Sequence, residues 1–254
     1  MLHQYTGKAL VLYTSSMKTC LLIPGNPAIE SQYRAWMQEI EHRHPSIHIV
    51  YASSYVLFSR RLNYLEYDQA MTAHYEHIFL GLDASEKIIL LVHSVGAYFA
   101  FRLLEKYPDK IKKVIVLFPY LGHSHIPLLK LISIPYWIDR FFPLAEIVSA
   151  CTQLFRGKCK DSTSNISTKE LTACLRFGVR QCMYFSKYIF DIQSISQYAH
   201  NIQFIYTDND KWCPEETIGP LKSFSKSTKT ILPHDFIQIP KYRLAMIEEL
   251  EINA

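Results

Sequence analysis

Short apolar runs recur along the first half of the chain, and stretches with helical spacing of apolar residues separate them. The runs lie at Ala9 to Tyr13, Thr19 to Ile23, Ile47 to Tyr51, Ile88 to Val92 and Val114 to Phe118. Branched apolar residues without interruption are typical of strands buried on both faces. Helices are predicted at Ser31 to Glu41, Leu65 to Leu82 and Ala97 to Tyr107. The alternation predicts an α/β fold, with a mainly parallel sheet and helices on both faces.

The alternation stops after Phe118 and returns near the C-terminus. From Leu121 to about Gln197 there is no clear strand pattern, although the sequence is rich in apolar and aromatic residues. Strands are predicted again at Gln203 to Tyr206 and at Lys229 to Leu232. We therefore expect a core of residues 1–120 and 198–254, with a helical lid or cap insertion at 121–197 above the carboxyl ends of the strands.

A serine lies on the sharp turn between the strand at Ile88 to Val92 and the helix that follows. The turn reads Val92-His93-Ser94-Val95-Gly96. It matches the nucleophile pattern G-x-S-x-G at its serine and its second glycine, while Val92 replaces the first glycine. Because such a turn holds the hydroxyl clear of the sheet beside the first amides of a helix, Ser94 is predicted to be a nucleophile.

The loop after the strand at Thr19 to Ile23 reads PGNP from Pro24 to Pro27. In serine hydrolases with this type of turn, one oxyanion donor is the amide after the nucleophile, here Val95, and the other comes from this early loop. Proline has no N–H, so Gly25, Asn26 or Ala28 must donate, and Asn26 is favoured by its position. The same residues would also form an ordinary strand-to-helix turn.

Two loops near the C-terminus supply an acid and a histidine. Asp208 and Asp210 follow the strand at Gln203 to Tyr206, and His234 follows the last predicted strand. His234 is the sole histidine after residue 200. A catalytic triad needs an acid that orients a histidine and a histidine within reach of the serine. The sequence predicts Ser94, Asp210 and His234 as that triad, with Asp208 as the second choice for the acid.

Composition narrows the class of protein. The chain has 254 residues, 49% of them hydrophobic and 13% aromatic, and its formal net charge of +4 is not concentrated in a basic block, so nucleic acid is not expected as a partner. Its six cysteines show no C-x-x-C pair and no metal-ligand spacing, which favours a reduced, intracellular protein. No metal or organic cofactor is expected, and no apolar segment reaches the ~18 residues of a membrane span.

These motifs together resemble the lipid droplet-associated hydrolase family of serine α/β-hydrolases. The resemblance lies in Leu22 to Pro27 followed by Tyr33, His93 to Tyr98, Leu117 to Pro119, Asp210 to Pro214 and His234 to Phe236. It runs from about Leu21 to the C-terminal helix, with departures at Val92 and Ala28. It implies an α/β-hydrolase fold and assigns Ser94, Asp210 and His234 as the triad.

The resemblance also implies a substrate class and a location. Members of the family are placed on lipid droplets and the endoplasmic reticulum and are connected with cholesteryl ester and neutral lipid turnover. We expect a lipid ester substrate, an acyl-enzyme mechanism, and contact of the lid with a lipid droplet or membrane surface on the cytosolic side. Two alternatives stay open: a non-catalytic protein of this fold that binds lipid surfaces or a protein partner, and a thioesterase that acts on acyl-CoA.

Overall fold

Six parallel strands form one sheet in the order β2-β1-β3-β4-β5-β6. The strands are β1 (Lys18–Ile23), β2 (Ile47–Tyr51), β3 (Ile88–His93), β4 (Ile111–Leu117), β5 (Ile202–Tyr206) and β6 (Ser227–Lys229). All five neighbouring pairs are parallel. The sheet predicted from the apolar runs is therefore confirmed.

The computed structural model describes part of the chain. The described residues are 17–26, 28–53, 64–82, 86–121, 190–208, 210, 219–222, 224, 226–234, 236–250 and 252. The strand predicted at Ala9 to Tyr13 and most of the insertion predicted at 121–197 lie outside them. The insertion stays a prediction.

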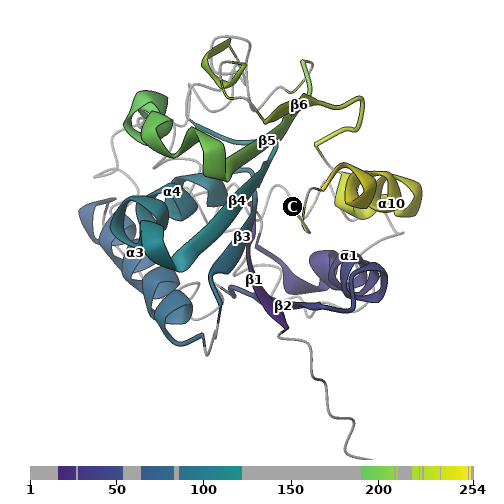
Figure 1. Cartoon of the computed structure of the whole chain (residues 1–254), viewed down its shortest axis with the longest axis horizontal. Helices are drawn as coiled ribbons and strands as arrows, with labels where there is room; N and C mark the ends of the chain where they lie inside the picture. Colours follow the sequence, from purple (N-terminus) through teal and green to yellow (C-terminus); the bar gives the residue numbers. More distant parts are fainter. Residues whose placement is uncertain are drawn as a thin grey trace, which may run out of the picture.

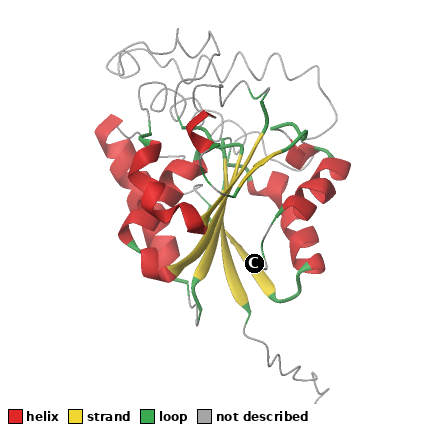
Figure 2. Ribbon diagram, turned by 45° about the horizontal axis from the view of Figure 1, so that its top comes forward, coloured by secondary structure: helices red, strands yellow, loops and turns green. Residues whose placement is uncertain are grey.

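Helices cover both faces of the sheet (Figures 1 and 2). The helices are α1 (Glu30–Arg43), α3 (Tyr64–Leu80), α4 (Gly96–Lys106) and α10 (Pro240–Glu249), with short 3-10 helices η1 (Pro108–Lys110), η2 (Ile192–Asn201) and η3 (Phe236–Gln238). Figure 1 shows α3 and α4 on one face and α1 and α10 on the other. The helices predicted in the first half of the chain are confirmed, each to within a few residues at its ends.

Side chains of the central strand β3 alternate between two apolar cores. Leu90 and Val92 are buried in the core beneath α3 and α4, whereas Ile89 and Leu91 are buried in the core beneath α1 and α10. In a strand, successive side chains point to opposite faces, so an unbroken apolar run fills both layers. Burial of β3 on both sides fixes the position of the turn that follows it.

The last strand differs from its prediction. We expected it at Lys229 to Leu232, but β6 ends at Lys229. The Thr230 amide still donates to the Tyr206 carbonyl at 2.8 Å, while the Thr230 hydroxyl accepts from the Leu232 amide at 3.1 Å and donates to Glu249. A threonine side chain that bonds its own backbone two residues on turns the chain out of the sheet.

Within the described ranges, no helix combines the length and the apolar character that a transmembrane span requires.

Candidate active site

The predicted site residues follow strands of the sheet at its carboxyl edge. Ser94 follows β3 at the centre of the sheet, Gly25 follows β1 beside it, Asp210 follows β5 and His234 follows β6. Ligands of open parallel sheets bind at this edge. Four segments that are far apart in the sequence therefore meet around the central strand.

Ser94 has the backbone conformation of a nucleophile turn. Its φ angle is 53°, in the left-handed region that non-glycine residues rarely adopt. The turn brings α4 so close to β1 that a Cβ on Gly96 would lie 2.6 Å from the Ile23 carbonyl oxygen. The Ser94 amide donates to the Leu117 carbonyl at 2.9 Å, which ties the turn to β4. Glycine is therefore required at 96, as the motif predicts.

The valine that replaces the first motif glycine is accommodated within the sheet. Val92 pairs with Ile23 on one side and with Val116 on the other, and its side chain is fully buried in the core beneath α3 and α4. The close approach of the helix occurs at Gly96, four residues later. Val92 thus coexists with the turn conformation at Ser94.

The structure distinguishes between the two candidate acids. His234 Nδ1 lies 2.7 Å from Oδ2 of Asp210, whose side chain is 1% exposed. Asp208 is exposed and forms an ion pair with Lys229. The preference for Asp210 over Asp208 agrees with this geometry. Since Nδ1 of His234 is engaged with the carboxylate, its Nε2 atom is left for another partner.

An aromatic cluster packs against the imidazole of His234. The ring centroid of Phe118 lies 5.4 Å from that of His234, and Phe236 packs on Phe118 at 5.6 Å. Phe118 has a φ angle of 47°, which places a second residue with left-handed backbone at the edge of the sheet. Its amide donates to the Ile205 carbonyl at 2.8 Å. The Phe118 ring thus covers part of the His234 imidazole.

Two further polar residues lie at the base of the site, and the sequence analysis did not assign them a role. His93 and Tyr33 are both buried, and the Tyr33 hydroxyl lies 2.8 Å from Nδ1 of His93. Burial lowers the pKa of His93 well below 6.5; the charge of His234 acts in the same direction, and the His234 backbone opposes it in part. The signal for His93 was its place inside the serine motif. The signals for Tyr33 were its helical spacing among apolar residues and its place after Leu22 to Pro27 in the family resemblance.

The same hydroxyl contacts the loop after β1. The Gly25 amide donates to Tyr33 at 2.9 Å, so this N–H is engaged within the protein. Of the three amides considered as oxyanion donors, Asn26 and Ala28 remain candidates. Val95 lies at the N-cap of α4, where a helix leaves its first amides without intrahelical acceptors.

No group of three or more histidine, cysteine or acidic side chains within the described part of the chain is arranged to hold a metal ion. The expectation that the reaction needs no metal or cofactor stays a prediction.

Comparison with solved structures identifies the fold. An N-formylmaleamic acid deformylase from Pseudomonas putida S16 is 16% identical with a TM-score of 0.59, and 91% of each chain is covered. The Vlm2 thioesterase domain is 13% identical with a TM-score of 0.60, covering 91% of this chain and 92% of that one. The hydrolase olei00960 from Oleispira antarctica is 14% identical with a TM-score of 0.53, covering 91% of each chain. The fold is that of the α/β-hydrolases.

Comparison with curated protein sequences gives no match. The model of the family described as lipid-droplet associated hydrolase matches residues 16–238, a stretch that includes the serine turn, both candidate acids and His234. With this match across most of its length, the chain belongs to the lipid-droplet associated hydrolase family.

Proposed function

We propose that the protein is a serine ester hydrolase that cleaves a lipid ester through Ser94, His234 and Asp210. The observation that carries the proposal is the 2.7 Å contact between His234 Nδ1 and the buried Asp210 carboxylate, at the sheet edge where Ser94 adopts a nucleophile turn. A buried carboxylate that accepts from Nδ1 fixes the histidine tautomer and stabilises the imidazolium that forms when Nε2 takes a proton.

The mechanism follows from this arrangement. His234 Nε2 takes the proton of the Ser94 hydroxyl as the oxygen attacks the ester carbonyl, and the negative charge moves to the carbonyl oxygen. The amides of Asn26 and Val95 stabilise that oxyanion. His234 then donates this proton to the departing alcohol, and the acyl group stays bound to the Ser94 oxygen. Water, activated by the same imidazole, cleaves the acyl-enzyme and releases the acid.

The family supports a lipid ester as the substrate. Its description links the hydrolase to lipid droplets. We propose a cholesteryl ester or another neutral lipid ester, hydrolysed at the surface of lipid droplets and the endoplasmic reticulum on the cytosolic side. The two alternatives, a thioesterase and a non-catalytic lipid or protein binder, are outcomes of the experiment below.

Labelling with a fluorophosphonate probe tests the catalytic part of the proposal. We expect the folded protein to be modified at Ser94, with labelling abolished in Ser94→Ala. Absence of labelling in folded protein would favour the non-catalytic binder. If the probe modifies Ser94, a fresh sample of unlabelled wild-type protein is assayed on cholesteryl oleate emulsion, triolein emulsion and palmitoyl-CoA. Activity confined to palmitoyl-CoA would contradict the ester substrate and favour the thioesterase.

A further inference from the structure

One buried hydroxyl connects two segments at the base of the site. Tyr33, on the first turn of α1, is 2% exposed. Its oxygen accepts the Gly25 amide at 2.9 Å and lies 2.8 Å from Nδ1 of His93, the residue before Ser94. A single side chain of α1 thus contacts both the loop after β1 and the serine turn after β3.

These contacts determine where the protons lie. The Gly25 N–H donates to the Tyr33 oxygen, so the hydrogen of Tyr33 is free to point to His93. Burial raises the pKa of Tyr33, which therefore keeps this hydrogen and donates it to Nδ1. A neutral imidazole whose Nδ1 accepts carries its own proton on Nε2. His93 is therefore a neutral imidazole in its Nε2–H form.

His93 lies beside His234, so the charge of His93 affects the protonation of His234. The centroids of the two imidazole rings lie 4.9 Å apart. The Nε2 atom of His93 is buried, and the backbone of His234 acts on this imidazole as a hydrogen-bonding group. In the proposed reaction His234 becomes an imidazolium, and a second positive charge at this distance would oppose its formation. Because His93 is neutral, it does not oppose the stabilisation that Asp210 gives to the His234 imidazolium.

The same contacts hold the early loop against the serine. A Cβ on Gly25 would lie 2.8 Å from Nδ1 of His93 and 2.9 Å from the Cβ of Ser94. The Gly25 backbone thus contacts the serine turn directly, with the Tyr33 hydroxyl bonded to both sides of the contact. The next residue in this loop is Asn26, the proposed oxyanion donor.

We propose that Tyr33 and His93 are positioning residues, in which the Tyr33 hydroxyl locks the loop after β1 to the serine turn and keeps His93 as the neutral Nε2–H imidazole beside His234. This inference rests on the proposed function. Neither residue touches the reacting atoms; each acts through groups that do.

Tyr33→Phe is the first test, because it keeps the ring and removes the hydroxyl that both contacts use. With p-nitrophenyl butyrate as the probe substrate, we expect kcat to fall about 10-fold to 100-fold and KM to change less than about 2-fold, because catalytic groups are displaced while the ester site is kept. Long-range ¹⁵N NMR of the imidazoles gives a readout of folded protein without turnover. We expect His93 in the Nε2–H form in the wild type and a mixture with the Nδ1–H form in Tyr33→Phe.

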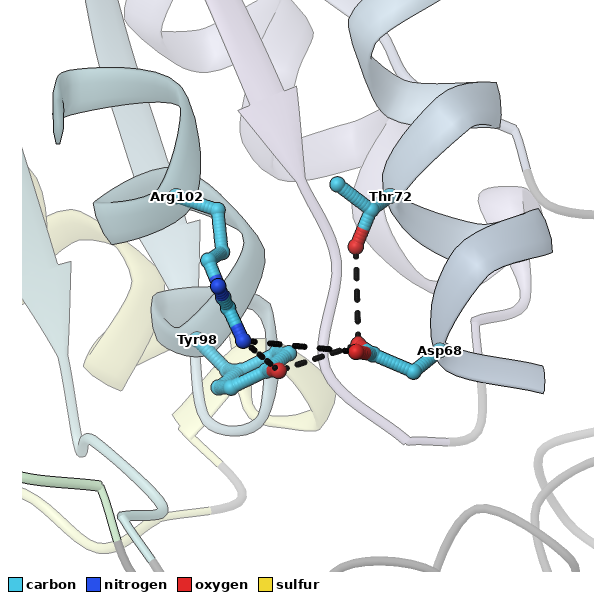
Figure 3. A network of polar contacts seen from close by, with 4 residues as sticks. All are labelled: Asp68, Thr72, Tyr98 and Arg102. Atoms are coloured by element: carbon cyan, nitrogen blue, oxygen red, sulfur yellow. Dashed lines mark hydrogen bonds and ion pairs between the residues drawn. The ribbon is translucent and has the colours of Figure 1, made fainter. Parts of the chain in front are cut away.

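Tyr98→Phe is the matched control. Tyr98 on α4 is 1% exposed and also uses its hydroxyl twice, donating to Asp68 at 3.0 Å and accepting from Arg102 at 2.9 Å (Figure 3). Asp68 also accepts from Thr72 at 3.5 Å. This network joins α3 to α4 away from His93. We expect Tyr98→Phe to lose about as much thermal stability as Tyr33→Phe. Its kcat should stay within about 2-fold of the wild-type value, and the His93 tautomer should be unchanged.

Substitutions at His93 separate positioning from packing. His93→Asn keeps an acceptor near the position of Nδ1, whereas His93→Leu has a similar shape and no acceptor. We expect Asn to retain most of the wild-type kcat and Leu to lose about as much as Tyr33→Phe. Equal activity of the Asn and Leu variants would overturn the positioning role.

The two proposals fail in different ways. If fluorophosphonate labels the wild type and Tyr33→Phe keeps full kcat, the inference is overturned and the proposed function stands. If the wild type is neither labelled nor active, the proposed function is overturned, and the NMR comparison still decides whether Tyr33 fixes the His93 tautomer. An Nδ1–H His93 in the folded wild type would overturn the inference in either case.

Discussion

His234 and Asp210 face each other across two loops, with 2.7 Å between Nδ1 of the imidazole and Oδ2 of the carboxylate. The carboxylate side chain is 1% exposed and the imidazole side chain 22% exposed. The acid is thus shielded from water, while the imidazole is partly exposed.

This pairing predicts different effects at the two neighbouring aspartates. Asp210→Asn removes the charge that stabilises the His234 imidazolium, so kcat on p-nitrophenyl butyrate is expected to fall about 10³-fold or more. Asp208→Asn, the matched control, removes an exposed ion pair with Lys229 and is expected to change kcat less than about 2-fold. Equal losses in the two variants would refute the assignment of Asp210.

The contact of Gly25 with the serine turn predicts that a single methyl group there is damaging. In Gly25→Ala the new Cβ would meet His93 and Ser94 below 3.0 Å, so the loop must shift. We expect kcat to fall at least about 10-fold and the free energy of unfolding to fall by about 1–3 kcal/mol. Gly219→Ala is the control, because a Cβ there has nothing within 4 Å. Steady-state kinetics and urea unfolding measure both effects, and an active Gly25→Ala would show that the loop is not constrained.

Placing the motif glycine at position 92 is expected to destabilise the folded protein. Val92 is fully buried in the core, so Val92→Gly leaves a cavity and adds backbone freedom to β3. We expect the free energy of unfolding to fall by about 3 kcal/mol. Since Ser94 already has its nucleophile conformation with valine present, the rate of fluorophosphonate labelling should not rise. A faster-labelled variant would show that Val92 limits the turn.

The buried neutral His93 makes stability depend on pH. Its pKa is lowered in the folded state, so below its ordinary value of 6.5 the unfolded chain binds a proton that the folded protein does not. Above pH 6.5 His93 is neutral in both states and does not lower the free energy of unfolding. As the pH falls below 6.5, the free energy of unfolding falls with a slope of about 1.4 kcal/mol per pH unit from this group. Among the residues that the structure describes, the titratable groups in contact with His93 are Tyr33 and His234, and Asp210 is bonded to His234.

Urea unfolding between pH 7.5 and 5 measures this dependence. His93→Asn removes the proton-binding group, so its free energy of unfolding should fall less steeply with acid than that of the wild type. Parallel curves for the two proteins would show that the pKa of His93 is the same in the folded and the unfolded protein.

The thiol of Cys20 is expected to be inert in the folded protein. Cys20 is fully buried in β1, and burial together with the charge of Glu41 raises its pKa to about 12. Reactivity with iodoacetamide requires an accessible thiolate. Peptide mapping at pH 8 should find Cys20 unmodified in native protein and fully modified after denaturation in guanidinium. Modification of the native protein at Cys20 would show that β1 opens locally.

The sequence by itself determined the alternation of strands and helices from Thr19 to Phe118 and the position of the serine turn. These features are local, because an unbroken apolar run such as Ile88 to Val92 must be buried on both faces, and a serine between such a strand and a helix must lie on a sharp turn. His234 was predicted as the catalytic histidine by elimination, since no other histidine follows residue 200. The end of β6 was missed, because the side-chain bonds of Thr230 compete with the strand there.

Only the tertiary structure decided which acid meets the histidine and which side chains support the serine turn. Asp208 and Asp210 lie two residues apart in one loop, and their surroundings differ because one faces Lys229 and the other faces His234. Tyr33 and His93 are 60 residues apart, and their contact depends on how α1 packs beside β1 and β3. Hydrogen bonds across such separations depend on packing of the whole core, which no local pattern of residues specifies.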